Sequence, residues 1–272
     1  MSKTVCTSCF RHCALADGEV GFCRARTARN GSVICSNYGD FTSIACDPIE
    51  KKPLARFFPG RSILSVGSYG CNLRCPFCQN YRISQADRDE SYLRHLEPEE
   101  LLELAQSIDG NLGVAFTYNE PLISWEYIRD AGKLFHEAGL QVVVVSNGTV
   151  SLPVLQQIMP SVDAMNLDYK GDASFYRSLS GSEEEVRNTI SYVYDKCHLE
   201  VTTLIVPGCN DEPAFVGEAA QFLASLSPDI PLHITRYFPR WKSELPPTPR
   251  KTLYQLKAVA EQHLKYVYLG NV

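Results

Sequence analysis

The stretch GCNLRCPFCQN, residues 70–80, places three cysteines within eight positions of the chain. Cys71, Cys75 and Cys78 follow the spacing C-x3-C-x2-C, and the next cysteine is Cys197. A four-iron cluster normally takes four thiolate ligands, and a closed structural zinc site also takes four. Three thiolates in one loop therefore predict a metal centre with an open coordination position, at which a substrate or cofactor binds.

The composition is typical of one large α/β domain with a small addition. The chain has 272 residues, of which 44% are hydrophobic, and its net charge is −5. Its 26 basic residues are scattered along the chain, which argues against nucleic-acid binding. The longest strongly apolar run, LQVVVVS, is too short to span a membrane, and the first ten residues lack the apolar core of a signal peptide. We therefore expect a soluble, cytoplasmic protein without nucleic-acid or membrane partners.

From Ser62 onward, strand-like and helix-like segments alternate. The expected strands cover residues 62–69, 113–118, 141–146, 163–169, 199–206, 231–237 and 266–270. The helical spacing of apolar residues predicts helices over 97–108, 121–139, 152–159 and 183–196, one capped by Asp211 and one that starts at Thr248–Pro249. The run QVVVVS at 141–146 is typical of a parallel strand that is buried on both faces.

Six β-then-α units followed by a last strand predict a parallel sheet in an α/β fold. A closed eightfold barrel typically needs about 250 residues, and the regular part of this chain is shorter. We therefore predict a partial, splayed (β/α)6 barrel over residues 61–272, preceded by a small cysteine-rich N-terminal module over residues 1–60. In such a barrel, ligands bind at the carboxyl ends of the strands.

The cysteine loop resembles that of the radical S-adenosylmethionine (SAM) enzymes, including the aromatic Phe77 before the last cysteine. The resemblance runs from about Ser62 to the end of the chain. It implies a [4Fe-4S] cluster on Cys71, Cys75 and Cys78, with SAM chelating the open iron. It also implies reductive cleavage of SAM to methionine and a 5′-deoxyadenosyl radical. A zinc knuckle or an electron-transfer cluster is the alternative for such a loop.

One further segment resembles the part of this superfamily that contacts the SAM amino group. TYNEP, residues 117–121, resembles a motif usually written GGE, with Tyr118 and Asn119 in place of the glycines. The resemblance implies a SAM contact for Glu120 and for the backbone at Asn119. The alternative is that Glu120 only begins a helix, near the positive end of its dipole.

Three strands end in motifs that resemble the pyruvate formate-lyase activating enzymes. SNG at 146–148 resembles their TNG, NLDYKG at 166–171 resembles their D-x-K, and the strand LHITRYFP carries a histidine at a matching place. An ordinary surface ion pair is the alternative for the D-x-K residues, which alternate to the same face of a strand. Val145 stands where that group has an acidic residue near a monovalent cation. The implied SAM contacts are Ser146, Asn147, Asp168, Lys170 and His233.

Along nearly its whole length the chain resembles the AmmeMemoRadiSam group of radical SAM enzymes, which are relatives of the pyruvate formate-lyase activating enzymes. CTSCFRHC, GEVGFCRAR, DPIEKKPLARFFPG and HITRYFPRW carry this resemblance outside the motifs above. It implies reduced flavodoxin or ferredoxin as the electron donor. Its candidate substrates are a glycyl-radical enzyme, or another protein or peptide.

Four cysteines near the start of the chain form a second group. Cys6, Cys9, Cys13 and Cys23 have the spacing C-x2-C-x3-C-x9-C. Four thiolates in a segment with little core of its own suit structural zinc, whose binding adds folding energy. An auxiliary four-iron cluster, or no metal, is the alternative. The segment DPIEKKP at 47–53 either covers the barrel mouth or forms a solvated linker. The remaining cysteines are expected to be ordinary small buried residues: Cys35, Cys46, Cys197 and Cys209.

The main interpretation is a SAM-cleaving enzyme that abstracts hydrogen from its substrate. Two alternatives stay open. The first is an enzyme that breaks a different carbon–sulfur bond of SAM and releases a 3-amino-3-carboxypropyl fragment. The second is a non-catalytic iron–sulfur redox protein, which would leave Glu120, Asp168 and Lys170 without a shared purpose.

Overall fold

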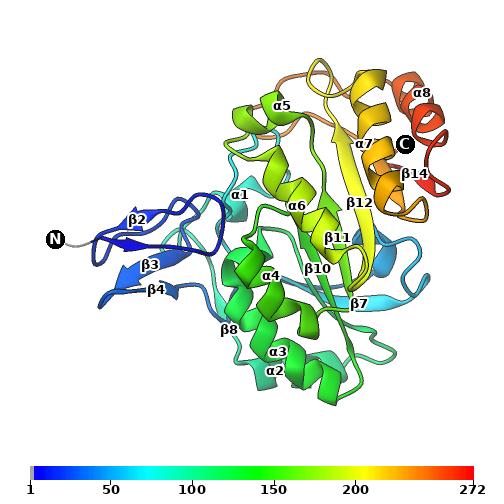
Figure 1. The fold of residues 1–272 in the computed structure, drawn as a ribbon. Coiled ribbons are helices and arrows are strands. Elements are labelled where there is room, and N and C mark those ends of the chain that lie inside the picture. Colours follow the sequence, from blue (N-terminus) through cyan, green and yellow to red (C-terminus); the bar gives the residue numbers. More distant parts are fainter. Residues whose placement is uncertain (1–2) are drawn as a thin grey trace.

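The computed structural model describes residues 3–272 and contains one open sheet of eight strands (Figure 1). The strands lie in the order β14-β13-β12-β11-β10-β9-β7-β6. Strands of this sheet that follow one another in the sequence are therefore also neighbours in space. A sheet that winds steadily in one direction is barrel-like rather than doubly wound. Seven strands run parallel: β7 (Ser62–Gly67), β9 (Gly113–Phe116), β10 (Gln141–Ser146), β11 (Ala164–Asp168), β12 (His198–Ile205), β13 (Leu232–Arg236) and β14 (Val267–Gly270). The predicted partial α/β barrel is thus confirmed.

Helices connect successive strands and pack on the outer face of the sheet (Figure 1). The longer ones are α2 (Pro98–Gln106), α3 (Trp125–Glu137), α4 (Leu152–Ile158), α6 (Glu183–Val193), α7 (Pro213–Leu226) and α8 (Arg250–Ala260). The run QVVVVS forms β10, which is apolar throughout because both of its faces are buried. Val142 and Val144 belong to the large outer core with the helices, whereas Val143 lies in a separate inner cluster. No helix within residues 3–272 is long and apolar enough to cross a membrane.

Several elements differ from the sequence-based expectations. The predicted cap at Asp211 is wrong, because α7 begins at Pro213 and Glu212 occupies its N-cap position. Asp211 instead accepts a hydrogen bond from the Gly208 N–H, within the turn that precedes the helix. The short helices α1 (Tyr81–Ser84) and α5 (Ala173–Ser178) were not expected. Each is six residues or shorter, too short for helical periodicity to mark it.

The edge of the sheet is formed by a strand from the segment assigned to the N-terminal module. Strand β6 (Ser43–Pro48) pairs antiparallel with β7 along its whole length. The short 3-10 helix η1 (Ile49–Lys51) follows it. The division of the chain at residue 60 into a small N-terminal module and the barrel stays a prediction, and the eight-stranded sheet contains strands from both sides of that position.

Residues 49–57, which we call the plug, pack against the inner face of the sheet. Their side chains Ile49, Leu54 and Phe57 form a buried cluster with inward-facing strand residues that include Ile63 and Val143. The Asn166 amide donates to the carbonyl of Pro53, and the Glu200 carboxylate accepts from the N–H groups of Ala55 and Arg56, which completes the attachment. Within DPIEKKP, Ile49 and Lys52 are therefore buried against the barrel, whereas Pro48, Glu50 and Lys51 are exposed.

Residues 3–35 contain two small hairpins that project from one side of the barrel (Figure 1). Strands β1 (Thr4–Val5) and β2 (Ala14–Leu15) form one, and β3 (Arg26–Arg29) and β4 (Ser32–Cys35) form the other. The second hairpin is tied to α3, because the Arg26 guanidinium makes two hydrogen bonds of 2.9 and 2.6 Å to the Glu126 carboxylate. Strands β5 (Asp40–Phe41) and β8 (Arg94–His95) make a third small pair.

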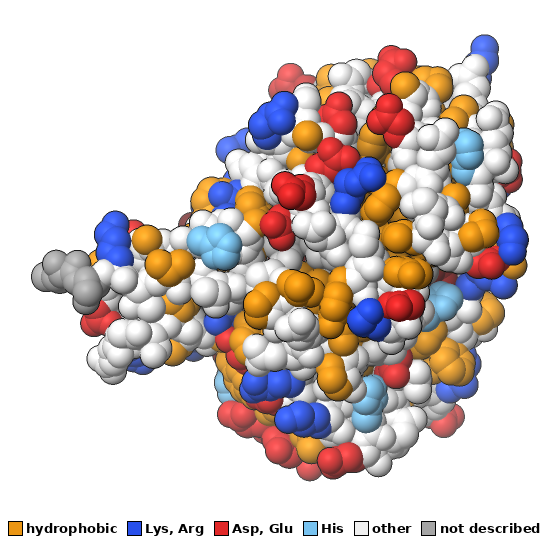
Figure 2. Space-filling view, viewed as in Figure 1, with side chains coloured by type: hydrophobic (Ala, Val, Ile, Leu, Met, Phe, Trp, Pro, Cys, Tyr) orange, Lys and Arg blue, Asp and Glu red, His pale blue; other side chains and the backbone are white. Residues whose placement is uncertain are grey.

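Figure 2 shows one face of the molecular surface, with side chains coloured by type. On the face shown in Figure 2, basic and acidic side chains are interspersed and do not gather into a basic patch.

Candidate active site

A cavity of about 1060 Å³ opens at the carboxyl ends of the parallel strands. Every residue that the sequence assigned to the cluster loop or to SAM lines this one cavity, although the residues come from five separate segments. They are Cys71, Cys75, Phe77, Cys78, Asn119, Glu120, Ser146, Asn147, Asp168, Lys170 and His233. Val145, the position linked to a monovalent cation, lines it as well.

The three loop cysteines lie after β7 in apolar surroundings. Cys75 is 9% exposed, and the loop packs with Phe77 and Phe175, whose ring centroids are 6.0 Å apart. Burial raises the pKa of Cys71 well above its ordinary value and that of Cys75 to about 11. Buried thiols of this kind become thiolates when a metal binds them, because the metal supplies the missing positive charge. The donor set therefore fits three ligands of an iron–sulfur cluster.

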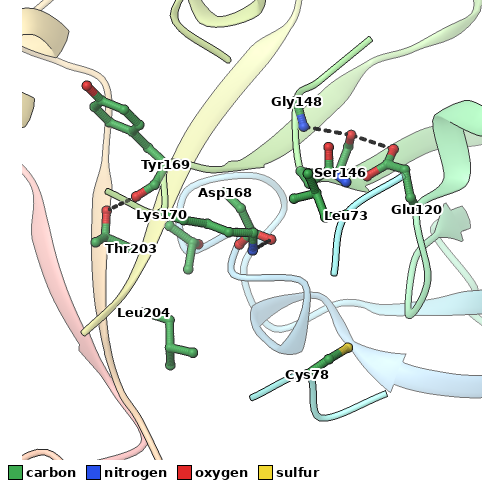
Figure 3. Close-up of polar contacts among 12 residues, drawn as sticks. Leu73, Cys78, Glu120, Ser146, Gly148, Asp168, Tyr169, Lys170, Thr203 and Leu204 are labelled. Atoms are coloured by element: carbon green, nitrogen blue, oxygen red, sulfur yellow. Dashed lines mark hydrogen bonds and ion pairs between the residues drawn. The ribbon is translucent and has the colours of Figure 1, made fainter. Parts of the chain in front are cut away.

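Glu120 is buried beside this loop and joins two strand ends. Its carboxylate accepts hydrogen bonds from Ser146 Oγ and the Asn147 N–H, both at 2.7 Å, and from the Leu122 N–H at 3.0 Å (Figure 3). Burial raises the pKa of Glu120 to about 7, although these hydrogen bonds oppose the shift. It also occupies the N-cap position of the short 3-10 helix Pro121–Ser124, so the helix-start interpretation and the cavity interpretation both describe its position.

The two asparagines have different surroundings. Asn119 Nδ2 donates to the carbonyl oxygens of Tyr69 and Gly70, each at 3.1 Å, so its side chain holds the backbone that enters the cysteine loop. Asn147 Nδ2 lies 2.9 Å from Asn72 Oδ1 and 3.7 Å from Cys71 Sγ. The Asn147 side chain therefore contacts the cysteine loop itself, whereas the Asn119 side chain binds the backbone just before the loop.

Asp168 and Lys170 form an ion pair at the end of β11. Lys170 Nζ lies 2.7 Å from Asp168 Oδ2, and Figure 3 shows the pair between the strand end and the segment that carries Cys78. Burial would lower the pKa of Lys170, but the charges of Asp168 and Cys75 outweigh it and raise the pKa. The side chain of Lys170 is 15% exposed, so this is not an ordinary surface pair.

His233 is held by Glu200, a residue that the sequence reasoning missed. His233 Nε2 lies 2.6 Å from Glu200 Oε2, and the imidazole stacks on Tyr268 with ring centroids 5.3 Å apart. Burial alone would raise the pKa of Glu200, but hydrogen bonds from His198, His233 and two backbone N–H groups lower it to about 2. The available signal was an acidic residue inside the strand pattern LEVTTLIV, on the same face as Thr202.

Replacing Glu200 with glutamine should destabilise the protein mainly above pH 4.5. The folded-state pKa of about 2 lies below the ordinary 4.5, so the stabilisation is complete above pH 4.5 and disappears as the pH falls toward 2. The difference corresponds to about 3 kcal/mol of unfolding free energy at pH 7. Urea unfolding of metal-free parent and variant at pH 7 and pH 3 measures it. An equal difference at both pH values would show that the negative charge of Glu200 does not contribute.

The N-terminal cysteines lie against the cysteine loop. Cys6 and Cys23 are buried, the Cys6 N–H donates to the carbonyl of Cys13, and burial raises the pKa of Cys9, with smaller contributions from Cys6 and Cys13. Within residues 3–272, no three or more Cys, His, Asp or Glu side chains converge as they would around a single metal ion. The metal of these four cysteines therefore stays a prediction.

Contacts between the two cysteine segments are direct. The Cys71 N–H donates to the Cys23 carbonyl at 3.1 Å. The guanidinium groups of Arg11 and Arg74 lie 3.4 and 3.9 Å from the centroid of the Phe22 ring. Gly70 has a φ of +87°, and a Cβ there would collide with the Cys23 carbonyl oxygen, so this approach requires glycine.

The remaining cysteines only partly match their expected burial. Cys35 and Cys197 are partly buried, whereas Cys46 and Cys209 are exposed. The expectation of buried residues is therefore wrong for Cys46 and Cys209. Cys46 lies on the edge strand β6, which has a neighbour on one side only, and Cys209 lies in the turn before α7.

Comparison with known proteins identifies relatives over the whole chain. The description "Radical SAM superfamily" matches residues 65–216, which is more than half of the chain. An uncharacterised protein of Methanocaldococcus jannaschii is 39% identical over all of this chain and 82% of its own length. A protein of the same organism, provisionally named a glycyl-radical enzyme activating enzyme, is 22% identical over 79% of this chain and 91% of its own.

A solved structure supports the same fold. A domain of a pyruvate-formate lyase-activating enzyme from Bacteroides vulgatus superposes with a TM-score of 0.52 at 19% sequence identity. The match covers 58% of this chain and 99% of that domain.

Proposed function

The chain belongs to the radical SAM superfamily, and from this premise we propose that it binds a [4Fe-4S] cluster through Cys71, Cys75 and Cys78 and cleaves SAM reductively. One observation carries the proposal: a single cavity brings the three thiols together with Glu120, Asp168 and Lys170. The bound cluster would supply the electron that converts SAM to methionine and a 5′-deoxyadenosyl radical, which abstracts hydrogen from a substrate.

The polar residues of the cavity match the two ends of SAM. Glu120, whose carboxylate already gathers three donors, is placed to accept a hydrogen bond from an ammonium group. Lys170 and Asp168 offer a cation and an anion within 2.7 Å of each other to the carboxylate or ribose of SAM. His233, oriented by Glu200 and stacked on Tyr268, offers a flat surface to the adenosyl group.

The substrate proposal rests on the relatives. The glycyl-radical enzyme activating enzyme among them and the activating-enzyme fold favour a protein or peptide substrate, such as the glycine-bearing segment of a glycyl-radical enzyme. We propose reduced flavodoxin or ferredoxin as the electron donor. For Cys6, Cys9, Cys13 and Cys23 we propose structural zinc, with an auxiliary cluster as the second candidate.

Anaerobically reconstituted protein with dithionite is expected to convert SAM slowly to 5′-deoxyadenosine and methionine even without substrate. Liquid chromatography of the products, with cluster-free protein as the control, measures this. Methylthioadenosine as the main product would instead support transfer of the 3-amino-3-carboxypropyl group. A reduced cluster that leaves SAM intact would favour the redox-protein alternative.

A further inference from the structure

A second group of polar side chains lines the same cavity on the side of β6. Lys52, at the end of η1, lies 2.9 Å from Asp47 Oδ2 through its Nζ atom and 3.4 Å from the Tyr118 hydroxyl. That hydroxyl donates to Asp47 Oδ2 at 2.7 Å. All three residues line the cavity, and none is needed for the SAM contacts proposed above.

Lys52 is unusual because it is buried and yet borders a large cavity. Its side chain is 2% exposed, whereas that of its neighbour Lys51, which also pairs with Asp47, is 67% exposed. Lys52 is carried by the plug, whose backbone Glu200 and Asn166 fix to the sheet. The amine therefore has a fixed position in the cavity wall, as a reacting group requires.

Tyr118 reaches this group through a strained backbone. Its φ is +72°, a left-handed conformation that side-chain-bearing residues rarely adopt. Its ring lies under Lys52, with Nζ 4.6 Å from the ring centroid. A glycine would adopt this conformation without strain. We therefore infer that the phenol of Tyr118 has a functional role.

We propose that Lys52 is a covalent substrate site, which forms an imine with a small 2-oxo acid. The ammonium group of Lys52 and the carbonyl of the substrate combine to give a protonated imine and one water molecule. The new bond joins Nζ to the carbonyl carbon, and the carbonyl oxygen leaves as water with two of the Nζ protons. No oxidant or reductant is consumed.

The surroundings of Lys52 suit each stage of this reaction. The protonated imine keeps one N–H and one positive charge, so its ion pair with Asp47 persists. Burial lowers the pKa of Lys52, with Asp47 opposing the shift, which favours release of a proton for nucleophilic attack. Tyr118, bonded to Asp47 and within reach of Nζ, is placed to pass a proton to the departing oxygen.

Two arginines of the cavity wall are suited to bind a carboxylate on the carbonyl compound. Arg236 and Arg240 line the cavity from β13 and the loop after it. Arg236 contacts the protein through Nε, which donates to the Thr248 carbonyl at 2.8 Å. A 2-oxo acid offers a carbonyl to Lys52 and a carboxylate to these cations. The imine would hold the substrate in the same cavity as the cysteine loop. What happens to the bound substrate there depends on the proposed function, on which this part of the proposal rests.

Reduction with cyanoborohydride in the presence of pyruvate tests the proposal. We expect peptide mass spectrometry of the reconstituted protein to find one adduct, on Lys52. Lys52→Arg keeps the ion pair with Asp47 and should lose the adduct, whereas Lys51→Ala, the matched control, should retain it. Tyr118→Phe should slow its formation at least about tenfold.

Equal labelling of Lys51 and Lys52, or no adduct on Lys52 with pyruvate or glyoxylate, would overturn the proposal. Labelling that survives in Lys52→Arg would do so too. The trapping reaction requires neither SAM nor a reduced cluster. Its outcome is therefore separate from the formation of 5′-deoxyadenosine, which tests the proposed function.

Discussion

Replacement of Cys71, Cys75 and Cys78 by alanine is expected to remove the iron–sulfur cluster and with it all SAM cleavage. These three thiols are the cysteines that line the cavity, and a four-iron cluster is held by cysteine thiolates. The variant should lack broad iron–sulfur absorption and show no signal of a reduced cluster in electron paramagnetic resonance. This is the largest effect that we expect of any substitution.

The same variant separates the two groups of cysteines. If Cys6, Cys9, Cys13 and Cys23 hold zinc, metal analysis should still find close to one zinc per chain. If they hold a second cluster, about four irons should persist. Replacing these four residues instead should spare the cavity cluster, provided that circular dichroism shows the fold intact, because loss of a structural metal unfolds its segment. A folded triple variant that binds neither zinc nor iron would contradict an N-terminal metal site.

Lys170→Ala and Asp168→Ala are expected to weaken SAM binding strongly while the cluster stays assembled. Each removes one partner of a partly buried pair, and the loss of one such partner costs about 2–5 kcal/mol. That is roughly a 30-fold to several-thousand-fold rise in the SAM dissociation constant. Equilibrium binding to the reconstituted protein measures the constant, and iron content checks the cluster.

Asp195 and Lys196 provide a matched control for this prediction. They form a pair with the same 2.7 Å separation, but their side chains are 55% and 37% exposed. Lys196→Ala should therefore leave SAM binding unchanged, because an exposed pair away from the cavity contributes little. Unchanged SAM affinity in both Lys170→Ala and Asp168→Ala would make the cavity pair structural and refute its role with SAM.

Features that depend on short stretches of sequence, such as the bounds of β10 and the place of the motif residues, were predicted correctly. Strand β10 matches its predicted bounds, because an unbroken apolar run is a strong local signal. The motif residues were brought together because the carboxyl ends of parallel strands meet at one edge. Each prediction depended on a few neighbouring residues or on a general rule of the fold.

Features that depend on distant contacts were not predictable in this way. Nothing in the sequence of the plug indicates that the N–H groups of Ala55 and Arg56 will meet Glu200, more than 140 residues later. Tyr118 was seen only as a departure from a glycine motif, since its contact with Asp47 spans 71 residues. Likewise, the collision that makes Gly70 necessary involves Cys23, which belongs to another segment.

The plug also constrains the order in which the chain assembles. Residues 49–57 leave the ribosome early, but the carboxylate that receives Ala55 and Arg56 belongs to β12. The apolar residues that cover Ile49, Leu54 and Phe57 come from strands up to β11, so the nascent chain carries these side chains with apolar surface exposed until then. The interior of the barrel is thus filled by a segment that is made early and whose attachment is complete only once β12 has been synthesised.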